Sequence, residues 1–106
     1  MNYLTNAFSL NMLADSETSI TVKKLTADEA NEVAGNFHFV SIVGHADIAS
    51  MMSQQLDTDV KANRQTVTVG KGDQLLVCQY RGPRLPEGVQ TLPDGATLEW
   101  FRVEIE

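Results

Sequence analysis

Side chains that could act on a phosphate group occur in two well-separated parts of the chain. His45 comes directly after the apolar stretch 41–43 and a glycine, and Arg84 and Glu87 lie in a loop that contains two prolines. Histidine suits proton transfer near neutral pH, and arginine makes two-point contacts with phosphate oxygens. These residue types favour cleavage of an RNA phosphodiester, in which a ribose 2′-OH attacks the adjacent phosphorus, His45 protonates the leaving oxygen and Arg84 stabilises the developing charge. Glu87 could orient Arg84 or His45, or assist removal of a proton.

Each of these residues also has an ordinary structural interpretation. A single histidine beside a helix is more often a surface or capping residue, and a loop glutamate is usually a solvated carboxylate. Arg64, Arg81 and Arg84 are the arginines that could hold an anion, yet each one alone is typically a surface residue with a solvated head. Position in the fold must decide between these interpretations.

The chain offers little that could bind a metal. His38 and His45 are its only histidines, and its single cysteine, Cys78, follows the apolar run 75–77, where a buried strand residue is expected. No carboxylate cluster indicates magnesium. We therefore expect any catalysis to proceed without a metal or other cofactor, and we assign no role to His38 or to the Cys78 thiol.

Length and charge limit the classes of protein to which the chain can belong. Its 106 residues fit one domain, 1–106, and 42% hydrophobic residues are enough to bury a core. A net charge of −6 argues against a broad surface for long nucleic acid, although a pocket with a few arginines can hold a small anion. No apolar stretch approaches the ~20 residues of a membrane helix, and no basic secretion signal is present. We expect a cytoplasmic protein.

Helix signals are clear in two places. Thr26 begins a capping box for a helix predicted over 27–34, and Gly35 is expected to end it. Asp47 can cap an amphipathic helix over 47–56, whose methionines are expected to fill the core.

Strand signals fill most of the remaining chain and indicate an α/β fold, a single domain with a mixed sheet of about five strands flanked by helices. The strand over 19–25 could pair with the first strand, and residues 65–69 and 74–80 are expected to form a β-hairpin around a glycine-rich turn. Strands are predicted over 3–8, 19–25, 37–43, 65–69, 74–80 and 98–105.

Four short motifs occur together in a fixed order. They are Asn6-Ala7-Phe8-Ser9-x-Asn11, Ser41-Ile42-x-Gly44-His45, Asn63-Arg64 and Arg84-Leu85-x-Glu87-Gly88. In type, order and approximate spacing the set resembles the ring nuclease family that viruses use as type III anti-CRISPR proteins and that has relatives in cellular type III CRISPR loci.

The resemblance implies an activity and a set of site residues. The family cleaves cyclic tetra-adenylate, a second messenger of type III CRISPR immunity, to linear di-adenylate without metal, and so switches the signal off. By this resemblance His45 is catalytic, and Arg84 and Glu87 belong to the active site. The ligand pocket is then lined by Asn6, Ser9, Asn11, Arg64 and Gln79.

The resemblance also implies a homodimer. A ring of four nucleotides contains a two-fold axis, so a C2 dimer could present two copies of His45 to opposite phosphodiesters. The loop 81–88 or the segment 11–18 could close over the ring. Two other classes stay open: a module that binds cyclic oligoadenylate without cleaving it, and a structural or protein-interaction domain.

Overall fold

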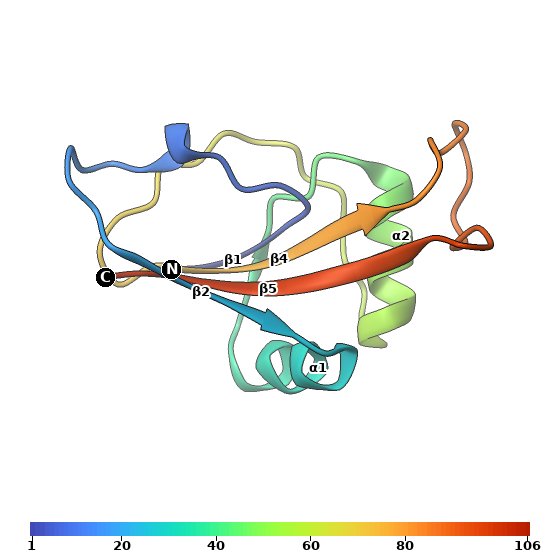
Figure 1. The fold of residues 1–106 in the computed structure, drawn as a ribbon, viewed down its shortest axis with the longest axis horizontal. Helices are drawn as coiled ribbons and strands as arrows, with labels where there is room; N and C mark the ends of the chain where they lie inside the picture. The colour runs from blue at the N-terminus through green and yellow to red at the C-terminus, as the bar shows by residue number, and fades with distance from the viewer.

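The computed structural model describes residues 1–106, which form one five-stranded mixed sheet with two α-helices (Figure 1). The predicted fold class is confirmed. In chain order the elements are β1 (Asn2–Thr5), the 3-10 turn η1 (Leu10–Met12), β2 (Ile20–Leu25), α1 (Ala27–Asn36), β3 (Val40–Ser41), α2 (Ala46–Leu56), β4 (Gln74–Arg81) and β5 (Thr97–Ile105).

The sheet has a parallel half and an antiparallel half. Its strand order is β2-β5-β4-β1-β3, and β1 runs parallel to both of its neighbours, with Leu4 opposite Ser41 on β3 and Leu76 on β4. β5 runs antiparallel to β4 and to β2. The carboxyl ends of β1, β3 and β4 therefore meet at one edge of the sheet, which is where ligands bind in many open α/β folds.

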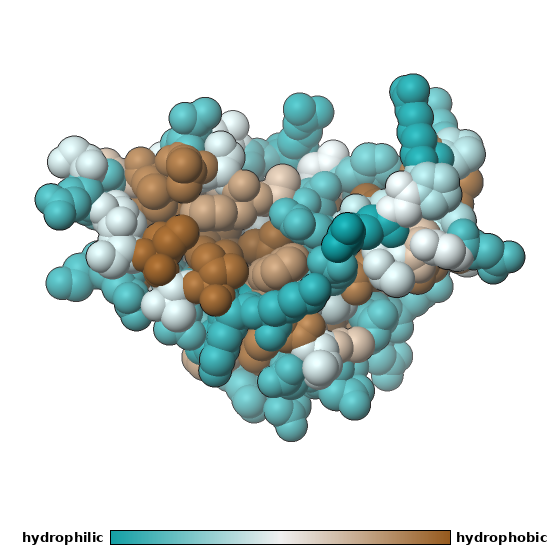
Figure 2. All heavy atoms as spheres, viewed as in Figure 1, coloured by the Kyte–Doolittle hydropathy of each residue, from teal (hydrophilic) through white to brown (hydrophobic).

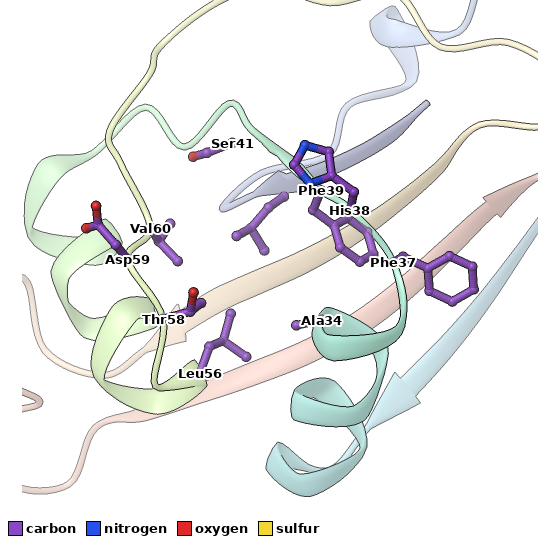
Figure 3. Close-up of a pocket in the computed structure, with 10 residues that line it drawn as sticks. Ala34, Phe37, His38, Phe39, Ser41, Leu56, Thr58, Asp59 and Val60 are labelled. Carbon is purple, nitrogen blue, oxygen red and sulfur yellow. The ribbon is translucent and has the colours of Figure 1, made fainter.

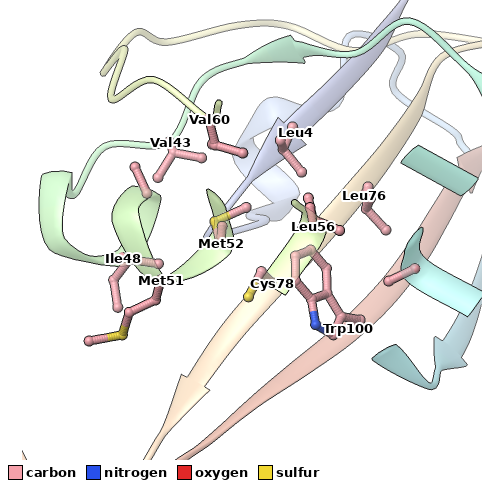
Figure 4. Close-up of a cluster of buried hydrophobic side chains, with 12 residues drawn as sticks. Leu4, Val43, Ile48, Met51, Met52, Leu56, Val60, Leu76, Cys78 and Trp100 are labelled. Atoms are coloured by element: carbon pink, nitrogen blue, oxygen red, sulfur yellow. The ribbon is translucent and has the colours of Figure 1, made fainter. Parts of the chain in front are cut away.

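Both α-helices pack on one face of the sheet and enclose the larger of two cores (Figure 4). Met51 and Met52 of α2 fill this core, as predicted, beside Cys78 and Trp100 from the sheet. Burial raises the pKa of the Cys78 thiol to about 12, so the thiol is protonated near neutral pH and is a poor nucleophile. The interpretation of Cys78 as a core residue is confirmed.

No α-helix covers the other face of the sheet. Its smaller core, which includes Val69, Leu75 and Val77, is covered by the segments around Met12 and Val67. Apolar side chains stay partly open to solvent here, with Val22 54% exposed, and Figure 2 shows a broad apolar area on the side of the molecule away from α2.

The predicted capping box at α1 is confirmed. Glu29 N–H donates to Thr26 Oγ1 at 3.2 Å, and Thr26 N–H donates to Glu29 Oε1 at 2.9 Å. The hydrogen bonds from the backbone and side chain of Thr26 hold the pKa of Glu29 below its usual value. The prediction that Gly35 ends the helix is wrong, because the helix continues through Gly35 to Asn36 and the extended Phe37 follows.

Two predicted strands are shorter than expected because some of their backbone groups are hydrogen-bonded to a side chain or to a neighbouring loop and not to another strand. β1 ends at Thr5 rather than at residue 8, since Thr5 Oγ1 donates to Ala7 O at 2.9 Å and accepts from Ala7 N–H at 3.2 Å. Only Val40 and Ser41 of the strand predicted over 37–43 are paired in the sheet. Beyond them, Asn63 N–H donates to the carbonyl oxygen of residue 43 at 2.8 Å.

Two predicted pairings are also wrong. Residues 65–69 do not form a hairpin with β4, because β1 and β5 already occupy both edges of β4. Val69 makes only an isolated parallel bridge with Leu13. β2 pairs with β5, with Leu25 opposite Trp100, and not with the first strand. The final strand over 98–105 is confirmed, one residue longer at its start.

Candidate functional site

Three predicted site residues follow the carboxyl ends of the three parallel strands. Asn6 comes directly after β1, His45 follows β3 at the start of α2, and Arg84 follows β4. His45, Arg84 and Glu87 line one cavity of about 550 Å³. The complete lining is Gly44, His45, Ala46, Asp47, Arg84, Leu85, Glu87 and Gly88. Residues far apart in sequence are thus brought to one place by the parallel half of the sheet.

His45 is the N-cap of α2, so the predicted start of the helix needs correction. Its ring Nδ1 accepts a hydrogen bond from Ile48 N–H at 3.3 Å, whereas Asp47 lies within the first turn of the helix and does not cap it. Because Nδ1 acts as an acceptor, the proton of the neutral ring is on Nε2. The structural interpretation of His45 as a cap is therefore correct, and the same hydrogen bond leaves an Nε2–H donor on an exposed side chain.

The N-terminus of α2 adds a favourable field for an anion. The first N–H groups of a helix have no acceptor within it and carry a partial positive charge. In α2 this end belongs to Ala46 and Asp47, which line the same cavity as His45. A phosphate in this cavity would meet backbone N–H groups, an imidazole and a guanidinium.

Arg84 and Glu87 are exposed and take part in none of the salt bridges of the protein. Arg81, by contrast, donates to Glu99 at 3.0 Å across the β4–β5 pair. Arg84 is therefore free to bind an external anion, whereas Arg81 is occupied. Glu87 is not hydrogen-bonded to Arg84 or to His45, so its predicted role as orienter or base stays a prediction.

The turn that carries Glu87 is fixed to α2 by a contact that sequence reasoning missed. Gly88 N–H donates to Asp47 Oδ2 at 2.9 Å, and Asp47 is only 9% exposed. Gly88 has a left-handed φ of 87°, and Val89 N–H donates to Pro86 O at 3.3 Å, which closes the turn around Glu87. The only sequence signal was an acidic residue near a helix start, and that pattern predicts a cap rather than a long-range contact.

Asn6 connects this cavity to a second one. Its Oδ1 accepts from Gly44 N–H at 3.2 Å, and Asn6 itself lines a neighbouring cavity of about 370 Å³. Gln79 lies in the same lining, together with Ala7, Phe8, Ile48 and Tyr80. The structure thus places Asn6 and Gln79 beside the His45 cavity.

Arg64 lies against Gly44. A Cβ added at Gly44 would be 3.3 Å from Arg64 Cγ, so the stem of Arg64 packs on the glycine backbone immediately before His45. The loop that carries Arg64 is held by the preceding residue, Asn63, whose Nδ2 donates to Ser41 O at 2.9 Å. Arg64 is exposed and without a carboxylate partner.

Ser9 and Asn11 are not brought to either cavity. Ser9 Oγ accepts from Asn11 N–H at 3.3 Å and caps η1, and both residues are exposed. In Figure 1 η1 lies far to the left of α2. Within one chain, their assignment to the ligand pocket has no geometric support.

A further cavity, of about 280 Å³, lies elsewhere on the helical side of the sheet, between the C-terminal parts of α1 and α2 (Figure 3). His38 is in its lining, mostly among apolar side chains such as Phe37 and Val60. None of the predicted site residues lines it.

Two further features concern metal binding and membrane insertion. No group of three or more His, Cys, Asp or Glu side chains is arranged to hold a metal ion. None of the helices is both long enough and apolar enough to cross a membrane.

Comparisons with known proteins agree with the fold. The family model described as STIV B116-like matches residues 2–95. Uncharacterized protein 26 of Sulfolobus islandicus filamentous virus (isolate Iceland/Hveragerdi) is 35% identical over 88 residues, which are 83% of this chain and 74% of that protein. The solved structure of B116 of Sulfolobus turreted icosahedral virus has a TM-score of 0.81 and 27% identity, and the match covers 97% of each chain.

The fold and the cavity define a small mixed α/β protein with phosphate-compatible side chains at the carboxyl ends of its parallel strands. The chain belongs to the STIV B116-like family. Both relatives described above are proteins of viruses, so this is a family that viruses encode.

Proposed function

We propose that the protein is a metal-independent ring nuclease that binds cyclic tetra-adenylate and cleaves it to linear di-adenylate, which would switch off type III CRISPR signalling. The observation that carries this proposal is the meeting of His45, Arg84 and Glu87 in one cavity, with Arg64 and Asn6 held on the adjoining Gly44. Their residue types are those that the phosphodiester chemistry requires, and they come from separate parts of the chain.

In the proposed step a ribose 2′-oxygen bonds to its adjacent phosphorus while the bond from phosphorus to the 5′-oxygen breaks. His45, as the imidazolium, donates its Nε2 proton to that departing oxygen; in this form Nδ1 also carries a proton, so the hydrogen bond from Ile48 N–H is released for the step. Arg84 and the N-terminal N–H groups of α2 stabilise the charge on the phosphoryl oxygens. The 2′-OH proton passes to a base, for which Glu87 is the candidate. Two such cleavages give two di-adenylates, each with a 5′-OH and a 2′,3′-cyclic phosphate.

A C2 homodimer is part of the proposal. The cavity of about 550 Å³ falls in the size range of pockets for a drug-sized ligand, ~300–1,000 Å³, and a ring of four nucleotides is much larger than such a ligand. Two protomers related by a two-fold axis would supply two matching cavities and two copies of His45 to one ring.

The test is to incubate the purified protein with radiolabelled cyclic tetra-adenylate in EDTA and to separate the products by chromatography. We expect linear di-adenylate to accumulate. An intact ring together with a raised melting temperature would instead identify a binding module, because a ligand that binds the folded state stabilises it. An intact ring without thermal stabilisation would contradict both proposals and favour a protein-interaction domain.

The second candidate, a sequestering or sensing module without catalysis, is favoured by one observation. His45 Nδ1 accepts the hydrogen bond of the helix cap, and Glu87 is hydrogen-bonded to neither His45 nor Arg84, so no carboxylate orients the histidine from behind. In many acid–base sites such an orienting group is present. The incubation described above separates turnover from binding directly.

Substitution of Gly44 by alanine tests the placement of Arg64 in the proposed ligand site. The new methyl group would lie 3.3 Å from Arg64 Cγ, so the stem of Arg64 must shift by a few tenths of an ångström, and we expect affinity for cyclic tetra-adenylate to fall by up to about tenfold. Titration calorimetry measures this loss when Gly44→Ala and its parent both carry His45→Asn, which is expected to bind the ring without cleaving it. Gly35→Ala is the matched control, since a Cβ there meets nothing within 4 Å. Wild-type affinity in Gly44→Ala would contradict the assignment of Arg64 to the ligand site.

A further inference from the structure

We infer that Asp47 is a positioning residue that holds the turn carrying Glu87 against the start of α2, and so sets the placement of Glu87 and Arg84 relative to His45. The inference rests on the proposed function for its catalytic readout. Its structural part, the hydrogen bond from Gly88 N–H to Asp47 Oδ2 at 2.9 Å, can be tested without any ligand.

This hydrogen bond is important because the carboxylate that accepts it is buried. Asp47 is one of the few polar residues that the fold buries, at 9% exposure, and a buried carboxylate is costly unless a donor satisfies it. The donor to its side chain is Gly88 N–H, from a loop 41 residues further along the chain. The carboxylate therefore makes one of two hydrogen bonds between α2 and this loop; the other, from Gln54 Nε2 to Gln90 O at 3.0 Å, lies near the C-terminal end of the helix.

Capping does not explain the presence of Asp47, because His45 already caps α2. Asp28 of α1 provides a direct comparison, since it also lies in the first turn, two residues after the N-cap Thr26. Asp28 is exposed and makes no recorded side-chain hydrogen bond. The two aspartates thus occupy the same position in their helices, but only Asp47 accepts a hydrogen bond from another segment of the chain.

Several contacts hold the loop on the helical layer, and the one with Asp47 lies next to Glu87. Leu85 and Val89, on either side of the turn, pack against the larger core and hold the loop down on the helical layer. These contacts, with the Gln54–Gln90 hydrogen bond, hold the flanks of the turn. The Gly88 hydrogen bond lies closest to the catalytic groups, since Gly88 follows Glu87 directly and Asp47 lies two residues after His45.

Asp47→Ala and Asp47→Asn together test the inference. Alanine removes the acceptor, and small misplacements of catalytic groups can cost ~10²-fold, so we expect kcat to fall by roughly ten- to a hundredfold with little change in KM. Asparagine keeps an acceptor oxygen at the same place, and we expect it to restore kcat to within about threefold of wild type. Asp28→Ala should leave kcat and KM unchanged.

Amide hydrogen exchange at Gly88 provides the second readout, independent of turnover. We expect Gly88 N–H to exchange faster in Asp47→Ala than in wild type, Asp47→Asn or Asp28→Ala. Unchanged exchange in Asp47→Ala would overturn the inference whether or not the protein is a nuclease. If wild type proves inactive, the proposed function fails, while accelerated exchange would still support Asp47 as the anchor of the turn. Equal loss of kcat in the alanine and asparagine variants would also overturn the inference, because this result would show that the charge of Asp47 matters and not its hydrogen bond to Gly88.

Discussion

Replacement of His45 by asparagine is expected to remove most ring cleavage while leaving the fold intact. Asparagine is among the best N-cap residues and can accept the hydrogen bond from Ile48 N–H that His45 Nδ1 accepts at 3.3 Å. Its amide cannot donate a proton to a leaving oxygen as an imidazolium can. General acid catalysis contributes ~10²–10⁴-fold, so we expect a loss of that order in the single-turnover rate, measured in EDTA.

Alanine at the same position provides the matched comparison. His45→Ala loses the cap as well as the acid, and loss of an N-cap typically costs ~1 kcal/mol, so its melting temperature should fall below that of His45→Asn. Cleavage should be lost to a similar extent in both variants. Wild-type rates in His45→Asn would contradict the assignment and leave His45 as a structural cap alone.

Removal of Arg84 is expected to have the second-largest effect. Arg84 is exposed in the cavity beside His45 without a carboxylate partner, so its guanidinium is available to a phosphoryl group. Loss of one charge-stabilising donor in an active site costs ~10²–10³ in kcat, and we expect Arg84→Ala to lie in this range. Arg84→Lys keeps the charge without the two-point geometry and should recover only part of the rate.

Arg81 is the natural control for that experiment. It lies three residues earlier and pairs with Glu99 at 3.0 Å, an exposed salt bridge of the kind that contributes ~0–1 kcal/mol to stability. Arg81→Ala should therefore cleave at close to the wild-type rate. Equal losses in Arg81→Ala and Arg84→Ala would indicate a general effect of positive charge and contradict a specific role for Arg84.

Elements with local signals could be predicted from the sequence, whereas those that depend on distant partners could not. The capping box at Thr26 involves residues three apart and was predicted correctly. The hairpin of 65–69 with β4 was wrong because the neighbours of β4 are β1 and β5, and nothing within residues 65–80 indicates that β1 occupies one of its edges. Strand alternation gives the period of a strand but not its partner.

In the candidate site, too, features with a sequence signal could be predicted and those that depend on distant contacts could not. His45, Arg84 and Glu87 could be selected by residue type and motif order, and they line one cavity because β1, β3 and β4 end at the same edge. The contact of Asp47 with Gly88 could not be predicted, since it depends on the packing of a loop onto a helix far away in sequence. Ser9 and Asn11 were selected by motif alone, and the capping of η1 accounts for the contact between them.

The parallel half of the sheet also has a consequence for the order of folding. β1 pairs only with β3 and β4, and its longer pairing places Leu4 opposite Leu76, so most of the chain must exist before the first strand gains its main partner. Such distant contacts carry a larger loop-closure cost and slow folding, whereas the antiparallel pair β4–β5 closes over a much shorter loop. We therefore expect the cavity around His45 to be assembled late in folding, after the β4–β5 pair.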